Sequence, residues 1–225
     1  MFMNHSLSEL VDLSEDQYTL LQEFACVDSL SRAFYLTGGT LLKARGIVPR
    51  LSNDLDFFTF PLFDQRAFMP ALRTFHSLLE KIFGSEHIIT TDRGFIHGPS
   101  GMVIDVIADE IQNVDEFVLF DKLSTSGLRD LVANKASALC SRDEIKDYLD
   151  IAFLTRDQNW SLKQLEEFAE KKFGLGTVTE EKLVTEILSK QSMFTVPPEI
   201  FLREPEKNGA IVQDQIAHLL ESSTL

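Results

Sequence analysis

The chain has 225 residues, of which 21 are Lys or Arg and 35 are Asp or Glu, giving a net charge of −14. A composition with 44% hydrophobic and 25% charged residues indicates a globular protein with a sizeable core and excludes a disordered chain. No run approaches the roughly 18 apolar residues of a membrane span, and no secretory signal opens the sequence, so we expect a cytoplasmic protein. The acidic balance argues against a broad nucleic-acid-binding surface, but a local basic cleft remains compatible with it.

The first half of the chain alternates helical patterns with short apolar runs that are typical of strands. In chain order, the predicted elements are a helix over 14–31, a strand over 33–36, a short helix over 40–46, a strand over 55–60 and a helix over 64–83. Segments 87–97 and 101–109 predict further strands, with a turn at Asp92, Arg93 and Gly94.

The second half is helical in pattern, with helices expected over 126–139, 143–155, 162–173, 180–193 and 210–221. Pro197, Pro198 and Pro205 forbid a continuous helix between the last two. We therefore predict an α+β fold, in which residues 1–120 form a small mixed β-sheet flanked by helices and residues 121–225 form a helical C-terminal domain. Cys26 and Cys140 lie inside helical patterns and are expected to be buried thiols.

The most informative segment runs from residue 36 to residue 58. Gly38, Gly39 and Thr40 join a predicted strand to a helix, and the backbone N–H groups of such a turn can accept a phosphate. The alternative is a purely structural Gly-Gly turn, because neither the dinucleotide fingerprint nor a Walker loop is present.

Three acidic residues lie in apolar strands. Asp54 and Asp56 are two residues apart, so they share one face of a strand at a spacing of about 6.6 Å, while Leu55 points into the core. Asp105 interrupts an apolar run and needs a partner or a metal ion. Three carboxylates on adjacent strands suit two Mg²⁺ ions about 3.5–4 Å apart. A solvated edge strand is the alternative for Asp54 and Asp56.

The predicted helix over 143–155 carries acids at i, i+4 and i+7, namely Asp143, Asp147 and Asp150, opposite an apolar stripe to be buried. The alternative is a solvated face held together by ion pairs. No zinc-type His or Cys spacing and no GxSxG motif appears in the sequence.

Gly38-Gly39-Thr40, then Arg50-x-Ser52-x-Asp54-x-Asp56, then Asp105 resemble the catalytic core of the DNA polymerase β-like nucleotidyltransferases. The segment that contains Lys135, Arg142, Asp147 and Asp150 is similar to that of the AbiEii/AbiGii toxin family within this superfamily. The resemblance spans residues 36–154. It implies a nucleotidyltransferase core over 1–120 and a helical domain over 121–225 that completes the active-site cleft.

The resemblance implies transfer of a nucleoside monophosphate from an NTP to an acceptor hydroxyl, such as a tRNA 3′ end, by a toxin restrained by a separately encoded antitoxin. Asp54, Asp56 and Asp105 would hold two Mg²⁺. The implied catalytic residues are Asp54, Asp56, Asp105, Lys135 and Asp147, and the implied nucleotide-binding residues are Gly38, Gly39, Thr40, Arg50, Ser52, Lys135, Arg142 and Asp150.

Two alternatives stay open. A nucleotidyltransferase of the same fold could modify a small molecule or a protein, and the charge of −14 favours this acceptor class. The other is a non-catalytic module that binds a nucleotide or a partner.

Overall fold

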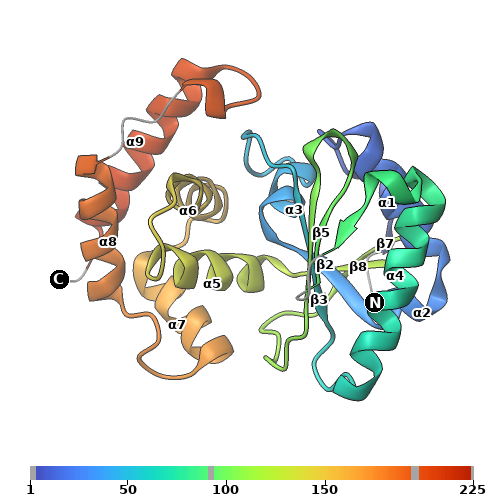
Figure 1. Ribbon diagram of the computed structural model, residues 1–225. Coiled ribbons are helices and arrows are strands. Elements are labelled where there is room, and N and C mark those ends of the chain that lie inside the picture. The colour runs from blue at the N-terminus through green and yellow to red at the C-terminus, as the bar shows by residue number, and fades with distance from the viewer. Residues whose placement is uncertain (1–3, 91–93, 194–197, 224–225) are drawn as a thin grey trace. The chain divides into compact units, whose positions relative to one another are not determined.

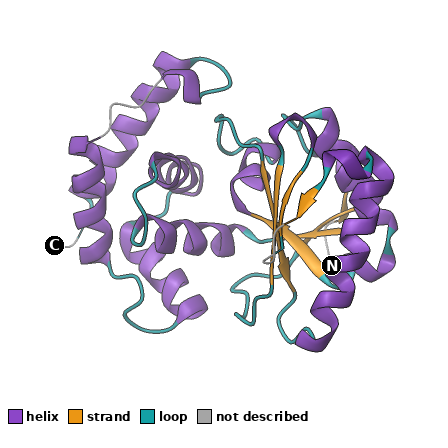
Figure 2. Cartoon of the chain, in the orientation of Figure 1, coloured by secondary structure: helices purple, strands orange, loops and turns teal. Residues whose placement is uncertain are grey.

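The computed structural model describes residues 4–90, 94–193 and 198–223. The chain divides into two compact units: unit 1 comprises Met1–Arg45 and Ser52–Gly127, and unit 2 comprises Gly46–Leu51 and Leu128–Leu225. The helical unit thus includes the segment Gly46–Leu51 from the first half of the sequence. The single boundary predicted near residue 121 did not assign this segment to the helical domain. The predicted α+β class is confirmed, with strands in unit 1 and helices in both units (Figure 2).

Unit 1 is built on a mixed sheet, whose described strands follow the order β1-β7-β8-β2-β3-β6-β5-β4 (Figure 1). The strands are β1 (Asn4–His5), β2 (Phe34–Thr37), β3 (Asp54–Thr59), β4 (Ile89–Thr90), β5 (Phe95–His97), β6 (Val103–Ile107), β7 (Val118–Phe120) and β8 (Leu123–Thr125). Strand β3 lies inside the sheet, antiparallel to β2 and parallel to β6. The alternative of a solvated edge strand is therefore wrong for β3.

The helices of unit 1 are α1 (Glu15–Cys26), α2 (Asp28–Ser31), α3 (Gly38–Ala44) and α4 (Phe68–Phe83). Ser14 begins α1 through a capping box with Gln17, as a Ser-x-x-Gln sequence favours. The single helix predicted over 14–31 is interrupted, because Val27 has extended dihedral angles (φ −99°, ψ 96°) and a new helix starts after it. The β7–β8 hairpin was not predicted, since its two strands have only three residues each.

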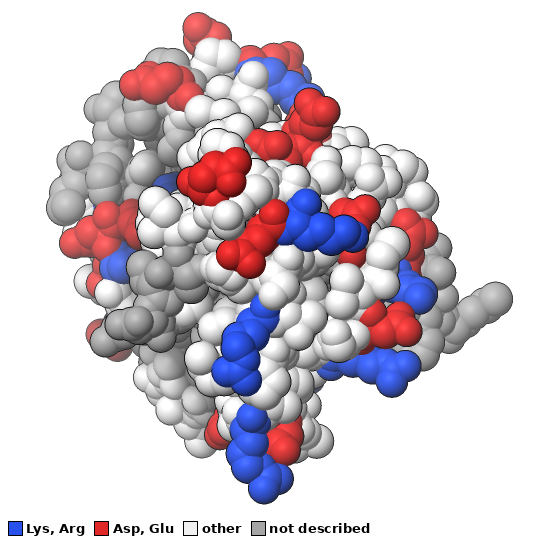
Figure 3. Space-filling view, turned by 45° about the vertical axis from the view of Figure 1, so that its right-hand side comes forward, with Lys and Arg blue, Asp and Glu red and all other residues white. Residues whose placement is uncertain are grey.

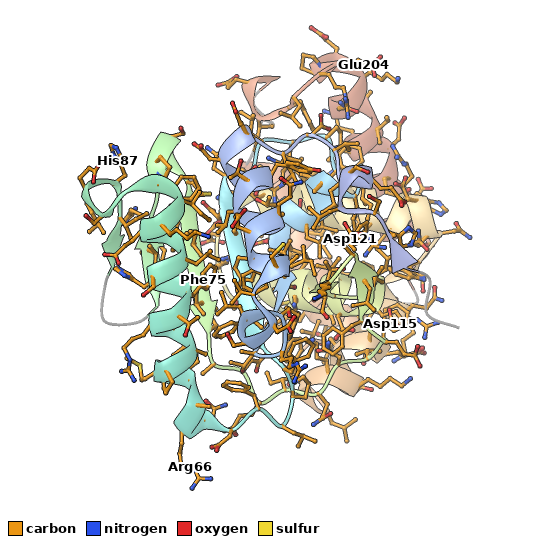
Figure 4. All side chains as sticks on the ribbon, turned by 90° about the vertical axis from the view of Figure 1, so that its right-hand side faces the viewer. Arg66, Phe75, His87, Asp115, Asp121 and Glu204 are labelled. Atoms are coloured by element: carbon orange, nitrogen blue, oxygen red, sulfur yellow. The ribbon has the colours of Figure 1, made fainter. Side chains whose placement is uncertain are left out.

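One face of the sheet carries the core of unit 1. The ring of Phe57 on β3 lies 4.7 Å from that of Phe24 on α1 and 5.0 Å from that of Phe75 on α4, between ring centroids. Phe75 points from α4 toward the sheet, whereas Arg66 projects outward (Figure 4). Because side chains alternate along a strand, Asp54 and Asp56 point to the face opposite the one that α1 and α4 cover.

Unit 2 contains α5 (Leu128–Leu139), α6 (Ile145–Gln158), α7 (Leu162–Phe173), α8 (Glu180–Met193) and α9 (Pro205–Glu221). Helix α9 begins at Pro205 rather than near residue 210, because a proline in the first turn loses only an N–H that has no intrahelical acceptor. Segment 46–51 is joined to residues 200–202 by backbone hydrogen bonds, from Leu51 N–H to Ile200 O at 2.9 Å and from Leu202 N–H to Pro49 O at 3.0 Å.

The two cysteines differ in exposure. Cys26 is the last residue of α1 and is exposed, so its prediction as a buried thiol is wrong. Cys140 is half-buried.

The predicted turn residues Asp92 and Arg93 lie outside the described residues. Among the helices that the structure describes, none is both long and apolar enough to cross a membrane.

Candidate active site

The Gly38 turn is fixed by the strand that follows it in the sheet. Gly38 has φ +80°, and a Cβ added to it would lie 1.8 Å from Oδ2 of Asp56. Only glycine fits this position, because a side chain would be strained by the backbone angle and would overlap the carboxylate. Strand β2 pairs with β3 so that Thr37 is opposite Asp56. The turn and the Asp56 carboxylate are therefore in direct contact.

The three predicted metal-binding acids lie on neighbouring strands. Asp56 is directly opposite Asp105 in the parallel β3–β6 pair, and Asp54 lies two residues earlier on the same face. All three are half-buried, whereas Leu55 and Ile104 between them are fully buried. The pKa of Asp105 is raised by its burial and, second, by the negative charge of Asp54. Asp54 and Asp105 thus lie near enough for the charge of one to act on the other.

The donor chemistry of these acids fits Mg²⁺, which prefers carboxylate oxygens and is usually bound by one or two carboxylates together with water and substrate phosphates. The pKa of Asp105 is raised by burial and, second, by repulsion from Asp54, and a cation would relieve that repulsion. Over the described ranges, no group of three or more His, Cys, Asp or Glu side chains is arranged so that it could hold a metal ion. The case for Asp54, Asp56 and Asp105 as ligands therefore rests on their strand register and their charge.

Two residues that sequence reasoning missed hold the chain where it enters β3. Lys43 Nζ donates to the Ser52 carbonyl at 2.6 Å, and Gln17 Nε2 donates to the Asn53 carbonyl at 3.2 Å. Thr40 adds a hydrogen bond of 2.9 Å from its hydroxyl to that of Ser52. Lys43 is buried within an apolar stretch of α3, and this was the available signal, because a buried lysine needs acceptors.

A chain of five alternating charges lies within unit 2, formed in order by Arg50, Asp150, Lys135, Asp147 and Arg142. Arg50 donates from Nε and Nη2 to the two carboxylate oxygens of Asp150, at 2.6 and 2.7 Å. Lys135 Nζ lies 2.8 Å from Asp150 Oδ2 and 3.0 Å from Asp147 Oδ1. Arg142 donates from Nε and Nη2 to Asp147, at 2.7 and 3.0 Å. Each aspartate is therefore shared by two cations.

The members of this charge chain are mostly removed from water. Asp147 and Asp150 are 0% exposed and Arg50 is 1% exposed, whereas the side chain of Arg142 is 49% exposed. Burial alone would raise the pKa of Asp150, but the charges of Lys135 and Arg50 outweigh it and the pKa is lowered. Burial alone would lower the pKa of Lys135, but Asp150 and Asp147 outweigh it and the pKa is raised. Asp150 and Lys135 therefore both stay ionised.

The predicted site residues fall into two groups, each within one unit. Unit 1 holds Gly38, Gly39, Thr40, Ser52, Asp54, Asp56 and Asp105, and unit 2 holds Arg50, Lys135, Arg142, Asp147 and Asp150. The alternative of a solvated helix face is wrong for Asp147 and Asp150, and it describes only Asp143, whose side chain is 77% exposed beside Lys190. Asp143 precedes the first residue of α6, so the three acids do not share one helical stripe.

A cavity of about 660 Å³ in unit 1 is separate from the acids. It is lined by the Ser6–Ser8 segment, by α1 residues such as Tyr18 and Cys26, and by the Asp121–Lys122 turn. Because β8 runs parallel to β2, this turn lies at the end of the strands opposite the Gly38 turn. None of the predicted site residues lines the cavity, so its size does not identify the site.

Comparison with known proteins agrees with the motifs. The family described as "Nucleotidyl transferase AbiEii toxin, Type IV TA system" matches residues 19–222. An uncharacterized protein of Aquifex aeolicus, aq_aa25, is 28% identical over 163 residues, which cover 72% of this chain and 76% of that protein. The crystal structure of JHP933 from Helicobacter pylori aligns with a TM-score of 0.49 at 17% identity, over 93% of this chain and 94% of that one. Since the family match spans most of the sequence, the chain belongs to the AbiEii nucleotidyltransferase toxin family.

Proposed function

We propose that this nucleotidyltransferase uses Mg²⁺ to move a nucleoside monophosphate from an NTP to an acceptor hydroxyl, with release of pyrophosphate. The observation that carries the proposal is the placement of Asp54, Asp56 and Asp105 on one face of two paired strands. Their carboxylates provide the hard oxygen ligands and the negative charge that a divalent cation requires. The family match argues against the alternative of a non-catalytic module.

Asp54 and Asp56 would hold Mg²⁺, and Asp105 would help to hold it and would accept the proton of the attacking hydroxyl. When bound, the metal supplies positive charge that stabilises the phosphates and lowers the pKa of the nucleophile. Asp56 is held against Gly38 and opposite Asp105, so its position is defined before any ligand arrives. The hydrogen bonds of Lys43 and Gln17 to residues 52 and 53 fix the start of β3 and hence Asp54.

The phosphates of the NTP would be held by the Gly38–Gly39–Thr40 backbone and by Ser52, and negative charge that builds up during transfer would be stabilised by Lys135 and Arg142. Arg142 is the half-exposed member of the charge chain, so its guanidinium can reach a ligand. Asp147 and Asp150 would orient these cations, because both bind Lys135 and neither is exposed. Arg50 was expected to contact the triphosphate, but its burial on Asp150 suggests the different role argued below.

The acceptor is the least constrained part of the proposal. We propose an RNA hydroxyl such as a tRNA 3′ end as the acceptor. We also propose a separately encoded antitoxin as the restraint, because the matched family is one of type IV toxin–antitoxin systems. Unit 1 carries eight Lys or Arg and eighteen Asp or Glu, whereas unit 2 carries thirteen and seventeen. RNA contacts are therefore expected mainly on unit 2, since cations hold phosphates.

A small-molecule or protein acceptor is the second candidate, and the charge of unit 1 favours it. On the face shown in Figure 3, basic and acidic side chains are interspersed rather than gathered into a basic patch. An uncharged acceptor or a basic peptide would not be repelled by such a surface.

The test incubates the protein with each labelled NTP and Mg²⁺, together with total tRNA, total protein or a panel of aminoglycosides. Label in tRNA that requires Asp54 supports the first candidate, and label only in another acceptor supports the second. The control is Glu116→Ala, which removes an exposed acid of the same unit. If neither Asp54→Ala nor EDTA alters the products, the enzymatic proposal is wrong.

A further inference from the structure

We propose that Arg50 is a positioning residue, which holds Lys135 in place through Asp150 and does not bind the phosphates itself. This inference rests on the proposed function, because it assigns Arg50 a part in the transfer step that Lys135 serves. It places Arg50, although it precedes Asp54 by only four residues, with the helical unit and not with the metal-binding acids.

The guanidinium of Arg50 is already occupied by protein acceptors. Nε and Nη2 form a two-pronged pair with Asp150, and Nη1 donates to the Leu51 carbonyl at 2.9 Å. The residue is 1% exposed. A phosphate could bind Arg50 only by displacing the Asp150 carboxylate from the guanidinium. Asp150 would then stay buried without this partner, which is costly.

The backbone of Arg50 is fixed as well. Residue 50 forms an isolated antiparallel bridge with Phe201, and hydrogen bonds on both sides join Leu51 to Ile200 and Leu202 to Pro49. Main chain and side chain are therefore held by different parts of unit 2. A side chain held in this way defines the position of its partner, which here is Asp150.

The charge chain connects Arg50 to Lys135 through Asp150. Asp150 uses Oδ2 for both Arg50 and Lys135, so rotating its carboxylate would break both interactions. Lys135 continues to Asp147, and Asp147 to the half-exposed Arg142. Unit 2 offers a contrast: the buried Lys172–Asp130 pair, with 2.6 Å between Nζ and Oδ1, joins α7 to α5 and includes none of the predicted site residues.

The test compares Arg50→Lys with Arg50→Gln, and uses Lys172→Arg as the matched buried control. Lysine keeps the charge of Arg50 but lacks the planar fork, so Asp150 loses its fixed orientation. We expect kcat for nucleotide transfer to fall about 10- to 100-fold while KM for the NTP stays within about 2-fold, because orientation rather than phosphate binding is lost. The control should retain both constants.

Two further measurements separate positioning from mere stability. The effects of Arg50→Lys and Asp150→Asn on kcat should not add, because both variants break the same link. Without substrate, mass-spectrometric mapping of amine acylation should show Lys135 protected in the wild type and in Lys172→Arg, but labelled several-fold faster in Arg50→Lys.

A rise of KM with unchanged kcat would make Arg50 a phosphate ligand, and unchanged kinetics and labelling would leave it without a role; either result overturns the proposal. So does loss of folding in both Arg50 variants while the control folds, since the pair would then be structural only. If the wild type transfers no nucleotide to any acceptor, the proposed function fails, but the labelling of Lys135 still decides whether Arg50 positions it.

Discussion

The aspartates of the two units have opposite electrostatic environments. On the sheet of unit 1, Asp105 is half-buried near Asp54 and its pKa is raised. In unit 2, Asp150 is fully buried between Arg50 and Lys135 and its pKa is lowered. Asp105 thus lies next to a like charge, whereas Asp150 lies between two cations. We expect this difference to separate the acids proposed to bind a metal ion from the acids proposed to position other side chains.

The largest effect is expected for Asp54→Asn. Loss of one metal-binding carboxylate should lower nucleotide transfer by about 10³-fold, equivalent to several kcal/mol of transition-state stabilisation. The free energy of unfolding should stay the same or rise slightly, because the repulsion with Asp105 is reduced. Activity assays and urea unfolding on the same preparation measure both quantities. A large loss of stability would contradict the contrast between the units.

Asp150→Ala should show the reverse pattern, with stability as the primary loss. Removing one partner from a buried ion network leaves Arg50 and Lys135 without their shared carboxylate and costs about 3–5 kcal/mol. Urea unfolding measures the change. Asp143→Ala is the control: the Asp143 side chain is 77% exposed, and the buried Lys190 keeps Glu186 and the Leu139 carbonyl as acceptors, so the loss should not exceed about 1 kcal/mol. Equal losses in the two variants would contradict the importance of burial.

Gly38→Ala should cost about 1–3 kcal/mol and also reduce activity, because the new Cβ overlaps the Asp56 carboxylate at a backbone angle that favours glycine. Gly101→Ala is a sharp control: Gly101 has φ +71°, but a Cβ added there meets nothing within 4 Å. Gly101→Ala should therefore lower the free energy of unfolding only through its strained backbone angle, and it should keep its activity. If both variants stay fully active, contact with Gly38 does not define the position of Asp56.

The smallest effect concerns pH. Because the pKa of Asp105 is raised in the folded state, folding favours the protonated carboxyl. The stability that protonated Asp105 contributes to the folded protein is therefore lost as the pH rises from the unfolded pKa of about 3.9 through the folded pKa. Asp105→Asn should therefore become more stable relative to the wild type over this rise. Free energies of unfolding of both proteins between pH 4 and 7 check the direction. A difference independent of pH would remove the electrostatic argument for unit 1.

Much of unit 1 could be predicted because its signals are local. The alternation around Leu55 correctly predicted one buried and one polar face of β3, and the apolar run around Asp105 predicted β6. The break at Val27 was missed, since its flanking segments have the same helical pattern. The β7–β8 hairpin was missed because a run of three residues is too short for a strand pattern.

Unit 2 was harder to predict because its important contacts are distant in sequence. The burial of Asp150 depends on Arg50, which is 100 residues away, so the pattern of α6 alone does not distinguish a buried acid from a solvated one. The resemblance to a known family singled out Lys135, Asp147 and Asp150, but it grouped Arg50 with the phosphate-binding residues. The contacts of its guanidinium became evident only in three dimensions.

The discontinuous path of the chain through unit 2 limits how this protein can be recombined with its relatives. Consider a chimera in which only the segment after Gly127 comes from a relative. Residue 150 would then come from the relative and Arg50 from this protein, so two residues that form a planar, two-pronged contact would have different origins. An exchange that also carries the six residues 46–51 keeps that contact intact. Unit 2 is therefore a single module encoded by two separate segments of the sequence, and both segments must be exchanged together.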